Sequence, residues 1–257
     1  SGFLNFMKIQ ELLAPFRRAV NDYSMISDND YIGVGVSGGK DSLVLLALLA
    51  AYRKFSPQKF DLCAVTIDMG FRSSDFSPVA RYCEELGVEY HVEKTDIAEI
   101  LFEIKKEKNP CSLCSKMRRG ALNNCLLKKG VRKLALGHHA DDVAETFLLS
   151  LLYEGRLSTF SPVSYMDKTG VTLIRPMIYI REKNIGAYAK QLPVVFNPCP
   201  ADKHTRREYM KKLLSEFSDE IPFAEQRIID AVTHPERNNL WPAPSHISGE
   251  ESRKTKK

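Results

Sequence analysis

Residues 31–42, which read YIGVGVSGGKDS, bring several phosphate-binding groups together. An apolar run typical of a strand comes first, and an apolar run typical of a helix follows from Leu43. The turn between them consists of Ser37, Gly38, Gly39, Lys40, Asp41 and Ser42. A strand, a glycine turn and a helix start present free backbone N–H groups and the positive end of a helix dipole at one point. Such a point binds anions, most often phosphate.

The residue types in this turn suit that role. The glycines let the backbone approach a ligand closely, Lys40 is a cation, the two serines offer hydroxyls, and Asp41 is placed to hold the helix start. Two other phosphate motifs fit poorly. Gly33 and Gly35 of a G-x-G-x-x-G match lie inside the strand-like run, and the Walker A motif needs Ser or Thr where Asp41 stands. An ordinary capped turn is the remaining alternative.

A second polar loop, GHHADDVAET at residues 137–146, also follows an apolar run. Asp141 and Asp142 offer carboxylates that can hold Mg²⁺ together with phosphate oxygens, and Gly137 and His138 come just before them. The alternative is a helix start whose acids interact favourably with the helix dipole, which does not account for two adjacent histidines. Asp68 ends a third apolar run and adds another carboxylate.

The six cysteines fall into two groups. Cys111 and Cys114 form a CxxC, and Cys199 shares with Cys111 a preceding Asn-Pro. Because proline keeps the chain extended, we expect these three thiolates to lie in loops, with a helix beginning only at Ser115. The others are expected to be buried hydrophobic side chains: Cys63, Cys83 and Cys125.

Three kinds of chemistry suit the three loop cysteines. They could hold zinc with His204 as a fourth ligand, hold a [4Fe–4S] cluster that leaves one iron open, or pass sulfur along as a persulfide. The sequence around the CxxC is basic and includes Arg118. Such cations favour thiolates and bind RNA phosphates, although a solvated helix face is the simpler alternative.

Composition indicates a globular, mildly basic protein. The 257 residues carry a formal net charge of +5, with 44% hydrophobic and 27% charged residues. This charge is compatible with RNA binding without requiring it. No apolar run approaches the length of a membrane span and no signal peptide is visible, so we expect a cytoplasmic protein without a membrane partner.

Alternating strands and helices separate the polar loops. Strands are expected at 31–36, 61–67, 88–93, 132–137 and 171–175, with a further short one at 193–196. Helices are expected at 7–22, 43–51, 76–87, 96–106, 115–129, 141–153, 182–191, 205–217 and 223–232. This alternation predicts an α/β fold, a doubly wound and mostly parallel sheet with helical N- and C-terminal additions. Because the loops at Ser37, Asp68 and His138 all follow strands, they can share one edge of the sheet.

The motifs together resemble a known family. SGGKDS matches every position of the signature of the PP-loop ATP pyrophosphatase superfamily. With CSLCSKMRRG, LGHHADDVAET, IRP and the late cysteine, residues from about 30 to about 200 resemble the TtcA-type tRNA 2-thiolation family. The late motif departs from the family's frequent CxxC, since it reads CPAD, but the resemblance requires only its first cysteine.

The resemblance implies a function and its site. The family uses ATP, Mg²⁺ and an oxygen-sensitive [4Fe–4S] cluster, to adenylate C2 of a pyrimidine and replace its oxygen with sulfur. Residues 37–42 correspond to the pyrophosphate loop, and Asp68, Gly137 and His138 are expected to complete the nucleotide site. The cluster ligands correspond to Cys111, Cys114 and Cys199. The expected catalytic residues are Lys40, Asp41, Arg118, Asp141 and Asp142.

The expected organisation and partners follow. An N-terminal helix and connection occupy 1–30, the PP-loop domain 31–200, C-terminal helices 201–244 and a disordered tail 245–257. The expected partners are tRNA and a sulfur donor, either a cysteine desulfurase or inorganic sulfide, and a homodimer is compatible with the sequence. Two other functions stay open: a different PP-loop enzyme, such as a 2-thiouridine or lysidine-type enzyme, and a non-enzymatic ATP-binding module with structural zinc.

Overall fold

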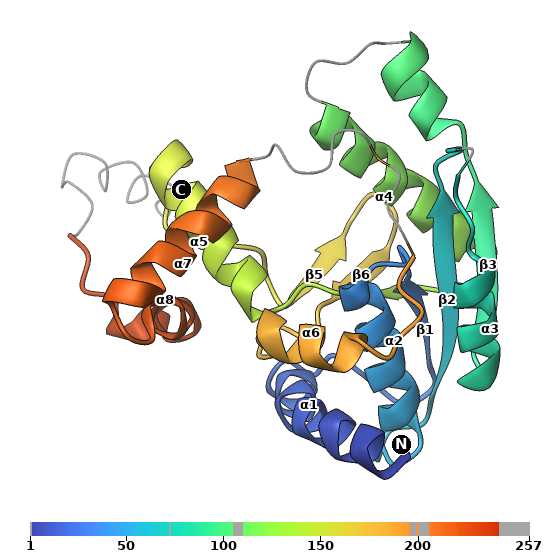
Figure 1. The fold of residues 1–257 in the computed structure, drawn as a ribbon, viewed down its shortest axis with the longest axis horizontal. Coiled ribbons are helices and arrows are strands. Elements are labelled where there is room, and N and C mark those ends of the chain that lie inside the picture. Colours follow the sequence, from blue (N-terminus) through green and yellow to red (C-terminus); the bar gives the residue numbers. More distant parts are fainter. Residues whose placement is uncertain (1, 72, 105–109, 196–198, 200–205, 242–257) are drawn as a thin grey trace, which may run out of the picture.

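The computed structural model describes residues 2–71, 73–104, 110–195, 199 and 206–241. Six strands form one sheet in the order β3-β2-β1-β4-β6-β5 (Figure 1). The strands are β1 (Asp30–Gly35), β2 (Phe60–Asp68), β3 (Glu89–Lys94), β4 (Lys133–Ala135), β5 (Val163–Met166) and β6 (Val171–Ile174). All neighbouring strands pair in parallel except β5, which runs antiparallel to β6. The predicted doubly wound, mostly parallel sheet is confirmed.

Helices cover both faces of the sheet (Figure 1). They are α1 (Gly2–Asp22), α2 (Lys40–Arg53), α3 (Ser77–Glu85), α4 (Pro110–Lys128), α5 (Ala140–Glu154), α6 (Glu182–Ala189), α7 (Arg206–Glu220) and α8 (Ala224–Thr233). One apolar cluster joins α1, α2, α3 and α6 to one face, and a second joins α4 to the other. The described helices include none that is both long and apolar enough to cross a membrane.

Helix α2 is the centre of the larger cluster. Its run from Leu43 to Ala50 is buried all round, as expected of a helix that is apolar on every side. Strands β1 and β2 are likewise buried along most of their length, because both faces of a central parallel strand are covered. The start of α2 is therefore held firmly at the end of β1.

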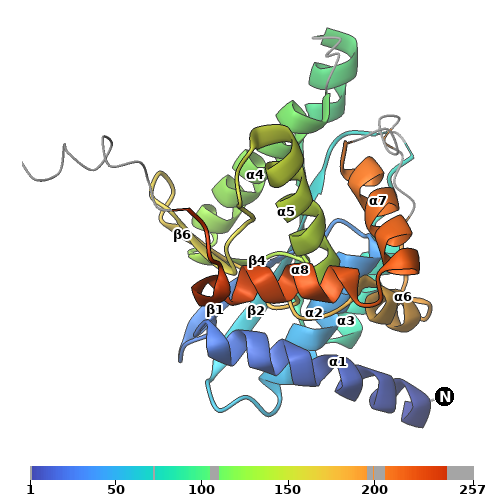
Figure 2. The same cartoon turned by 90° about the vertical axis from the view of Figure 1, so that its left-hand side faces the viewer.

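The C-terminal helices pack on α5 (Figure 2). Buried side chains from the three helices form their own cluster: Ala140, Ala144, Leu148, Met210, Leu214 and Ile229. Since α5 begins in the second polar loop, this packing also brings α7 close to that loop. The division of the chain at residue 200 stays a prediction, and the expected tail at 245–257 lies outside the described residues.

Several local predictions were wrong. Helix α4 begins at Pro110 instead of Ser115, so the CxxC lies in the first helical turn; proline is well tolerated there because its missing N–H would have no intrahelical partner. Residues 99–104 form a π-helix instead of part of a longer α-helix. Residues 193–195 form no strand, and the short edge strand β5 was not predicted.

Candidate active site

The loops after β2, β1 and β4 lie side by side, because these strands are neighbours and parallel. Adjacent strands are about 4.8 Å apart, so their carboxyl ends form one edge, here called the rim. The backbone N–H of Val36 donates to the carbonyl of Val65 at 2.9 Å, which extends the β1–β2 pairing up to the glycine turn. The predicted sharing of one edge by the three loops is confirmed.

The glycine turn holds its own shape. The Ser42 hydroxyl donates to the carbonyl of Gly39 at 2.9 Å and accepts from the N–H of Ser37 at 3.1 Å, while the N–H of Gly39 donates to Ser37 Oγ at 3.3 Å. Gly38 has a φ of +84°, and a Cβ there would lie 3.0 Å from Cβ of Val195. The turn therefore requires glycine at position 38 for both its backbone and its space.

The start of α2 has no side-chain cap. Gly39 is the N-cap residue, and Asp41 lies in the first turn instead of capping it, which corrects the expected role of Asp41 at the helix start. Its carboxylate instead accepts from Nζ of Lys40 at 2.8 Å. The uncapped helix start and the glycine turn have the free N–H groups that an anion site needs, and anion binding here stays a prediction.

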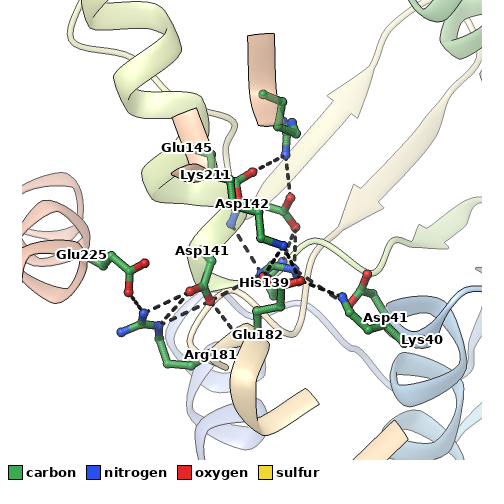
Figure 3. Close-up of polar contacts among 11 residues, drawn as sticks. Lys40, Asp41, His139, Asp141, Asp142, Glu145, Arg181, Glu182, Lys211 and Glu225 are labelled. Carbon is green, nitrogen blue, oxygen red and sulfur yellow. Dashed lines mark hydrogen bonds and ion pairs between the residues drawn. The ribbon is translucent and has the colours of Figure 1, made fainter. Parts of the chain in front are cut away.

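Lys40 lies between two carboxylates. Its Nζ is 2.8 Å from Asp41 Oδ1 and 3.0 Å from Glu182 Oε1, at the start of α6 (Figure 3). Burial alone would lower the pKa of Lys40, but hydrogen bonds to Asp41 and Glu182 outweigh it and raise the pKa. Lys40 is thus a cation at neutral pH.

The second loop contacts the first through its backbone. A Cβ on Gly137 would lie 3.1 Å from the carbonyl group of Asp41 and 3.2 Å from the N–H nitrogen of Ser42, so any other residue there would push against the backbone at the start of α2. His139 and Asp142 then cap α5 reciprocally: the N–H of His139 donates to Asp142 Oδ2 at 3.0 Å, and the N–H of Asp142 donates to His139 Nδ1 at 3.4 Å. The cap explains one histidine and one acid of this loop.

Asp141 connects α5 to α6. It accepts two hydrogen bonds from Arg181 at 3.0 and 3.2 Å to Oδ1, and one from the N–H of Glu182 at 2.6 Å to Oδ2. Burial opposes its ionisation, but hydrogen bonds from His139 and Glu182 and the charge of Arg181 outweigh burial and lower the pKa of Asp141 to about 2. Arg181 also pairs with Glu225 of α8 (Figure 3).

Asp142 faces α7. Its Oδ1 accepts from Arg207 Nη1 at 2.5 Å, and the same nitrogen lies 3.4 Å from Glu145 Oε2. Burial, and then the neighbouring charge of Asp142, raise the pKa of Glu145 to about 7. Two carboxyl groups and one guanidinium therefore meet beside the first turn of α5.

His138 lies beside an aromatic ring, whereas Asp68 lies at the rim. The His138 ring lies 5.0 Å from that of Phe160, and its buried Nδ1 has no hydrogen-bond partner among the described residues. Burial lowers the pKa of His138 to about 4, so the ring is neutral at pH 7. Asp68 ends β2 at the rim, where its Oδ1 accepts from the N–H of Gly70 at 3.0 Å.

Cys114 and Cys199 line one small cavity next to the rim. Met69, the residue after Asp68, lies in its wall, and the Cys114 thiol donates to Met69 Sδ at 3.6 Å. Most of the remaining wall is apolar: Phe71, Ala98, Leu101, Phe102 and Pro110. Cys111 lies in the same helical turn as Cys114, but its side chain and the whole of His204 lie outside the described part of the chain.

A short stretch of chain connects the cysteine cavity with the glycine turn. The N–H of Val195 donates to the carbonyl of Gly38 at 2.9 Å. Cys199 is four residues further along, so a fully extended chain would put it at most about 14 Å from Val195. Arg118 lies one helical turn after Cys114 on the same side of α4. The other cysteines are buried as predicted, at 0%, 0% and 2% exposure: Cys63, Cys83 and Cys125.

Sequence reasoning missed the residues that α6 and α7 contribute. Glu182, Arg207 and Lys211 belong to no motif, and each reaches the loops only through the packing of its helix. Glu145 was part of the second motif, but nothing in the sequence showed that its carboxyl would be buried.

A model of a PP-loop domain matches residues 7–216. Among curated proteins, the tRNA-cytidine(32) 2-sulfurtransferase of Geobacter sulfurreducens is 38% identical over 237 residues, which cover 90% of this chain and 91% of that protein. The chain belongs to this sulfurtransferase family. The enzyme of the same name from Syntrophotalea carbinolica is 35% identical and covers 93% of both chains.

A solved structure supports this family assignment. The U34-tRNA thiolase NcsA from Methanococcus maripaludis with its [4Fe-4S] cluster superposes with a TM-score of 0.73 at 25% identity. The match covers 93% of this chain and 82% of that one. The 2-sulfurtransferase family thus shares the PP-loop fold with a thiolase of a different tRNA position.

Proposed function

We propose that this protein is an ATP-dependent tRNA sulfurtransferase. It adenylates C2 of a cytidine in the anticodon loop and replaces the oxygen there with sulfur, releasing AMP and pyrophosphate. The observation that carries this proposal is the proximity of the PP-loop to a cavity lined by Cys114 and Cys199 at one rim. The curated relatives are named for sulfur transfer to cytidine 32 of tRNA, which favours cytidine over uridine.

The chemistry requires an activated oxygen. In the first step, the C2 oxygen attacks the α-phosphorus of ATP, and the bond to pyrophosphate breaks. In the second, a sulfur nucleophile adds at C2, and the carbon–oxygen bond breaks as AMP leaves. The glycine turn and the N-terminus of α2 would hold the pyrophosphate part, with Lys40 offsetting its charge. Residues 37–42 would therefore both position the pyrophosphate part of ATP and offset its negative charge.

The cysteines are of the right residue type to hold an iron–sulfur cluster, but the cavity that Cys114 and Cys199 line must widen to contain one. Thiolates are the usual ligands of such clusters, and Cys111, Cys114 and Cys199 would supply three of them. A cluster so held leaves one iron without a protein ligand, which supplies a soft centre for the sulfur to be transferred. The cavity is about 30 Å³, the share of one water molecule in the liquid. Binding a cluster thus needs the walls of this cavity to move apart.

Magnesium would be held mainly by the phosphates of ATP. Both oxygens of Asp141 and both oxygens of Asp142 already accept hydrogen bonds. An ion bound by Asp142 would have to share the carboxylate with Arg207 and with the N–H of His139. We therefore propose Asp142 as a site residue next to the nucleotide, and Asp141 as a positioning residue that joins α5 to α6.

Nucleoside analysis tests this function. A strain lacking its own 2-thiocytidine enzyme would express the chain, and its tRNA would be digested and separated by mass. We expect 2-thiocytidine to return, and a Lys40→Ala variant to leave it absent. Return of 2-thiouridine instead would change the substrate, and no thiolated base from an iron-loaded, folded chain would overturn the proposal. Anaerobic purification with tightly bound zinc and no iron would favour the zinc module.

A further inference from the structure

We propose that Lys211 of α7 is a nucleotide-site positioning residue: it holds the carboxylate of Glu182 so that Lys40 can turn to the phosphates of ATP. This rests on the proposed ATP binding by the PP-loop. It gives the C-terminal helices a part in a site that the sequence places wholly within residues 31–200.

Glu182 is shared by two ammonium groups. Nζ of Lys40 lies 3.0 Å from its Oε1, and Nζ of Lys211 lies 2.8 Å from the same carboxylate (Figure 3). The backbone of Glu182 is fixed as well, since its N–H donates to Asp141 at 2.6 Å. The start of α6 therefore keeps Glu182 within reach of Lys40.

A bound triphosphate changes this balance of charge. Lys40 must then point to the phosphates, which leaves Glu182 with a single cationic partner, Lys211. Without Lys211, the ion pair with Glu182 would hold Lys40 away from the phosphates. The negative charge of Glu182 would also repel the incoming phosphates at short range. Hydrogen bonds to Glu182 raise the pKa of Lys211, outweighing the effect of its burial, so the residue is charged at neutral pH.

Helix α7 is built to keep Lys211 in place. The neighbouring Met210 and Leu214 are 0% and 2% exposed and pack on α5. One turn before Lys211, Arg207 binds Asp142. The next residue, Lys212, is a matched control, because its side chain is 76% exposed and its ion-pair partner, Glu216, lies on α7 itself.

A purely structural role makes a different prediction. If the Lys211–Glu182 pair only ties α7 to α6, then removing either partner should have the same effect, and removing both should be no better. If Lys211 instead neutralises Glu182, the two single changes should act in opposite directions on ATP binding. A double-mutant cycle separates these two cases.

The experiment measures the dissociation constant of a non-hydrolysable ATP analogue with the full chain. We expect Lys211→Met to weaken binding about tenfold, Lys212→Met to leave it unchanged, and Lys211→Arg to retain it. Glu182→Gln should bind as tightly as the wild type or tighter, and Lys211→Met with Glu182→Gln should return to within about threefold of the wild type. Thermal unfolding of each variant shows whether the chain is folded.

Two results would overturn the inference. One is wild-type binding by folded Lys211→Met, and the other is a double variant as weak as Lys211→Met alone. Both leave the proposed function standing, provided the wild-type chain still binds the analogue and releases AMP. A folded wild-type chain that binds no ATP analogue would instead remove the proposed function and this inference together.

Discussion

Gly38 carries two constraints that can be tested separately. Its φ of +84° disfavours any other residue, and a Cβ would also press on Val195 at 3.0 Å. Gly87 has a φ of +62° with nothing within 4 Å of its Cβ position, so it carries only the first constraint. We expect Gly87→Ala to cost about 1 kcal/mol in unfolding free energy and to keep full AMP formation.

Gly38→Ala should lower the unfolding free energy by more than Gly87→Ala does, and it should also reduce AMP formation. The turn would have to shift from Val195, and its N–H groups would no longer converge on one anion. We expect AMP formation to fall about a hundredfold, since an error of about 1 Å in position can cost that much. Unfolding curves and AMP release from both variants make the comparison. Equal activity of the two would show that the space beside Val195 is not needed.

Glu145 should make stability depend on pH. Its folded pKa of about 7 lies above the usual value of 4.5 for a glutamate, so between these two pH values the folded protein binds a proton there that the unfolded chain has released. Stability from this group is therefore full below about pH 4.5 and declines as the pH rises to about 7. Glu145→Gln removes this charge while keeping the side chain's size.

The test is unfolding free energy from pH 5 to 8. We expect Glu145→Gln to be more stable than the wild type at pH 8 by about 1 to 3 kcal/mol, with the difference shrinking toward pH 5. The exposed Glu216→Gln serves as a control with no such trend. A difference that is constant over the whole range would show that Glu145 is ionised throughout in the folded protein.

At the scale of elements, Cys114 of α4 and Cys199 of the late loop line one cavity although 85 residues separate them in the sequence. We expect Cys199→Ala to lose iron and the visible absorbance of anaerobically reconstituted protein while its affinity for ATP stays within about twofold. The reason is that Cys199 is a proposed ligand, whereas the PP-loop holds its shape through its own serines.

Cys83→Ala is the matched control for this loss. Cys83 is also a cysteine, but it lies on α3, is fully buried in the core and takes no part in the cavity. It should keep its iron. Loss of ATP binding together with iron in Cys199→Ala would mean that Cys199 supports the fold, and full iron retention would remove it from the ligand set.

Sequence predicted well those features that depend on local pattern. The strand, glycine turn and helix predicted over residues 31–51 are confirmed, because apolar periodicity and glycine position leave few alternatives there. The predicted start of α4 was wrong. A proline can end an extended loop or occupy the first position of a helix, and the local sequence around Pro110 does not distinguish these two cases. β5 was missed because a four-residue, mostly half-exposed edge strand has little pattern.

The whole molecule adds what no local pattern contains. Arg181 shows this best: it pairs with Asp141 of α5 and with Glu225 of α8, and its neighbour Glu182 binds Lys40 of α2. Four helices from distant parts of the sequence are thus joined at one point. Residue types alone could suggest that Asp141 is catalytic. Only the structure shows that both oxygens of its carboxylate accept hydrogen bonds from Arg181 and Glu182.

Arg181 is therefore expected to stabilise the packing of the C-terminal helices on the domain. Arg181→Met would leave Asp141 as a largely buried carboxylate without its main cation, at a cost of about 3 kcal/mol in unfolding free energy. The pKa of Asp141, which is about 2 in the wild type, should also rise, so the stability that the wild type loses as the pH falls from about 3.8 to about 2 should be smaller in the variant.

Arg156→Met is the control, because Arg156 pairs with Glu154 on the surface, where their side chains are 70% and 52% exposed. Exposed pairs contribute about 0 to 1 kcal/mol, so this variant should unfold almost as the wild type does. Chemical unfolding at pH 7, repeated at pH 3, compares the two. If both arginines cost the same, Asp141 is well solvated once Arg181 is gone, and the junction of α5, α6 and α8 then depends on apolar packing alone.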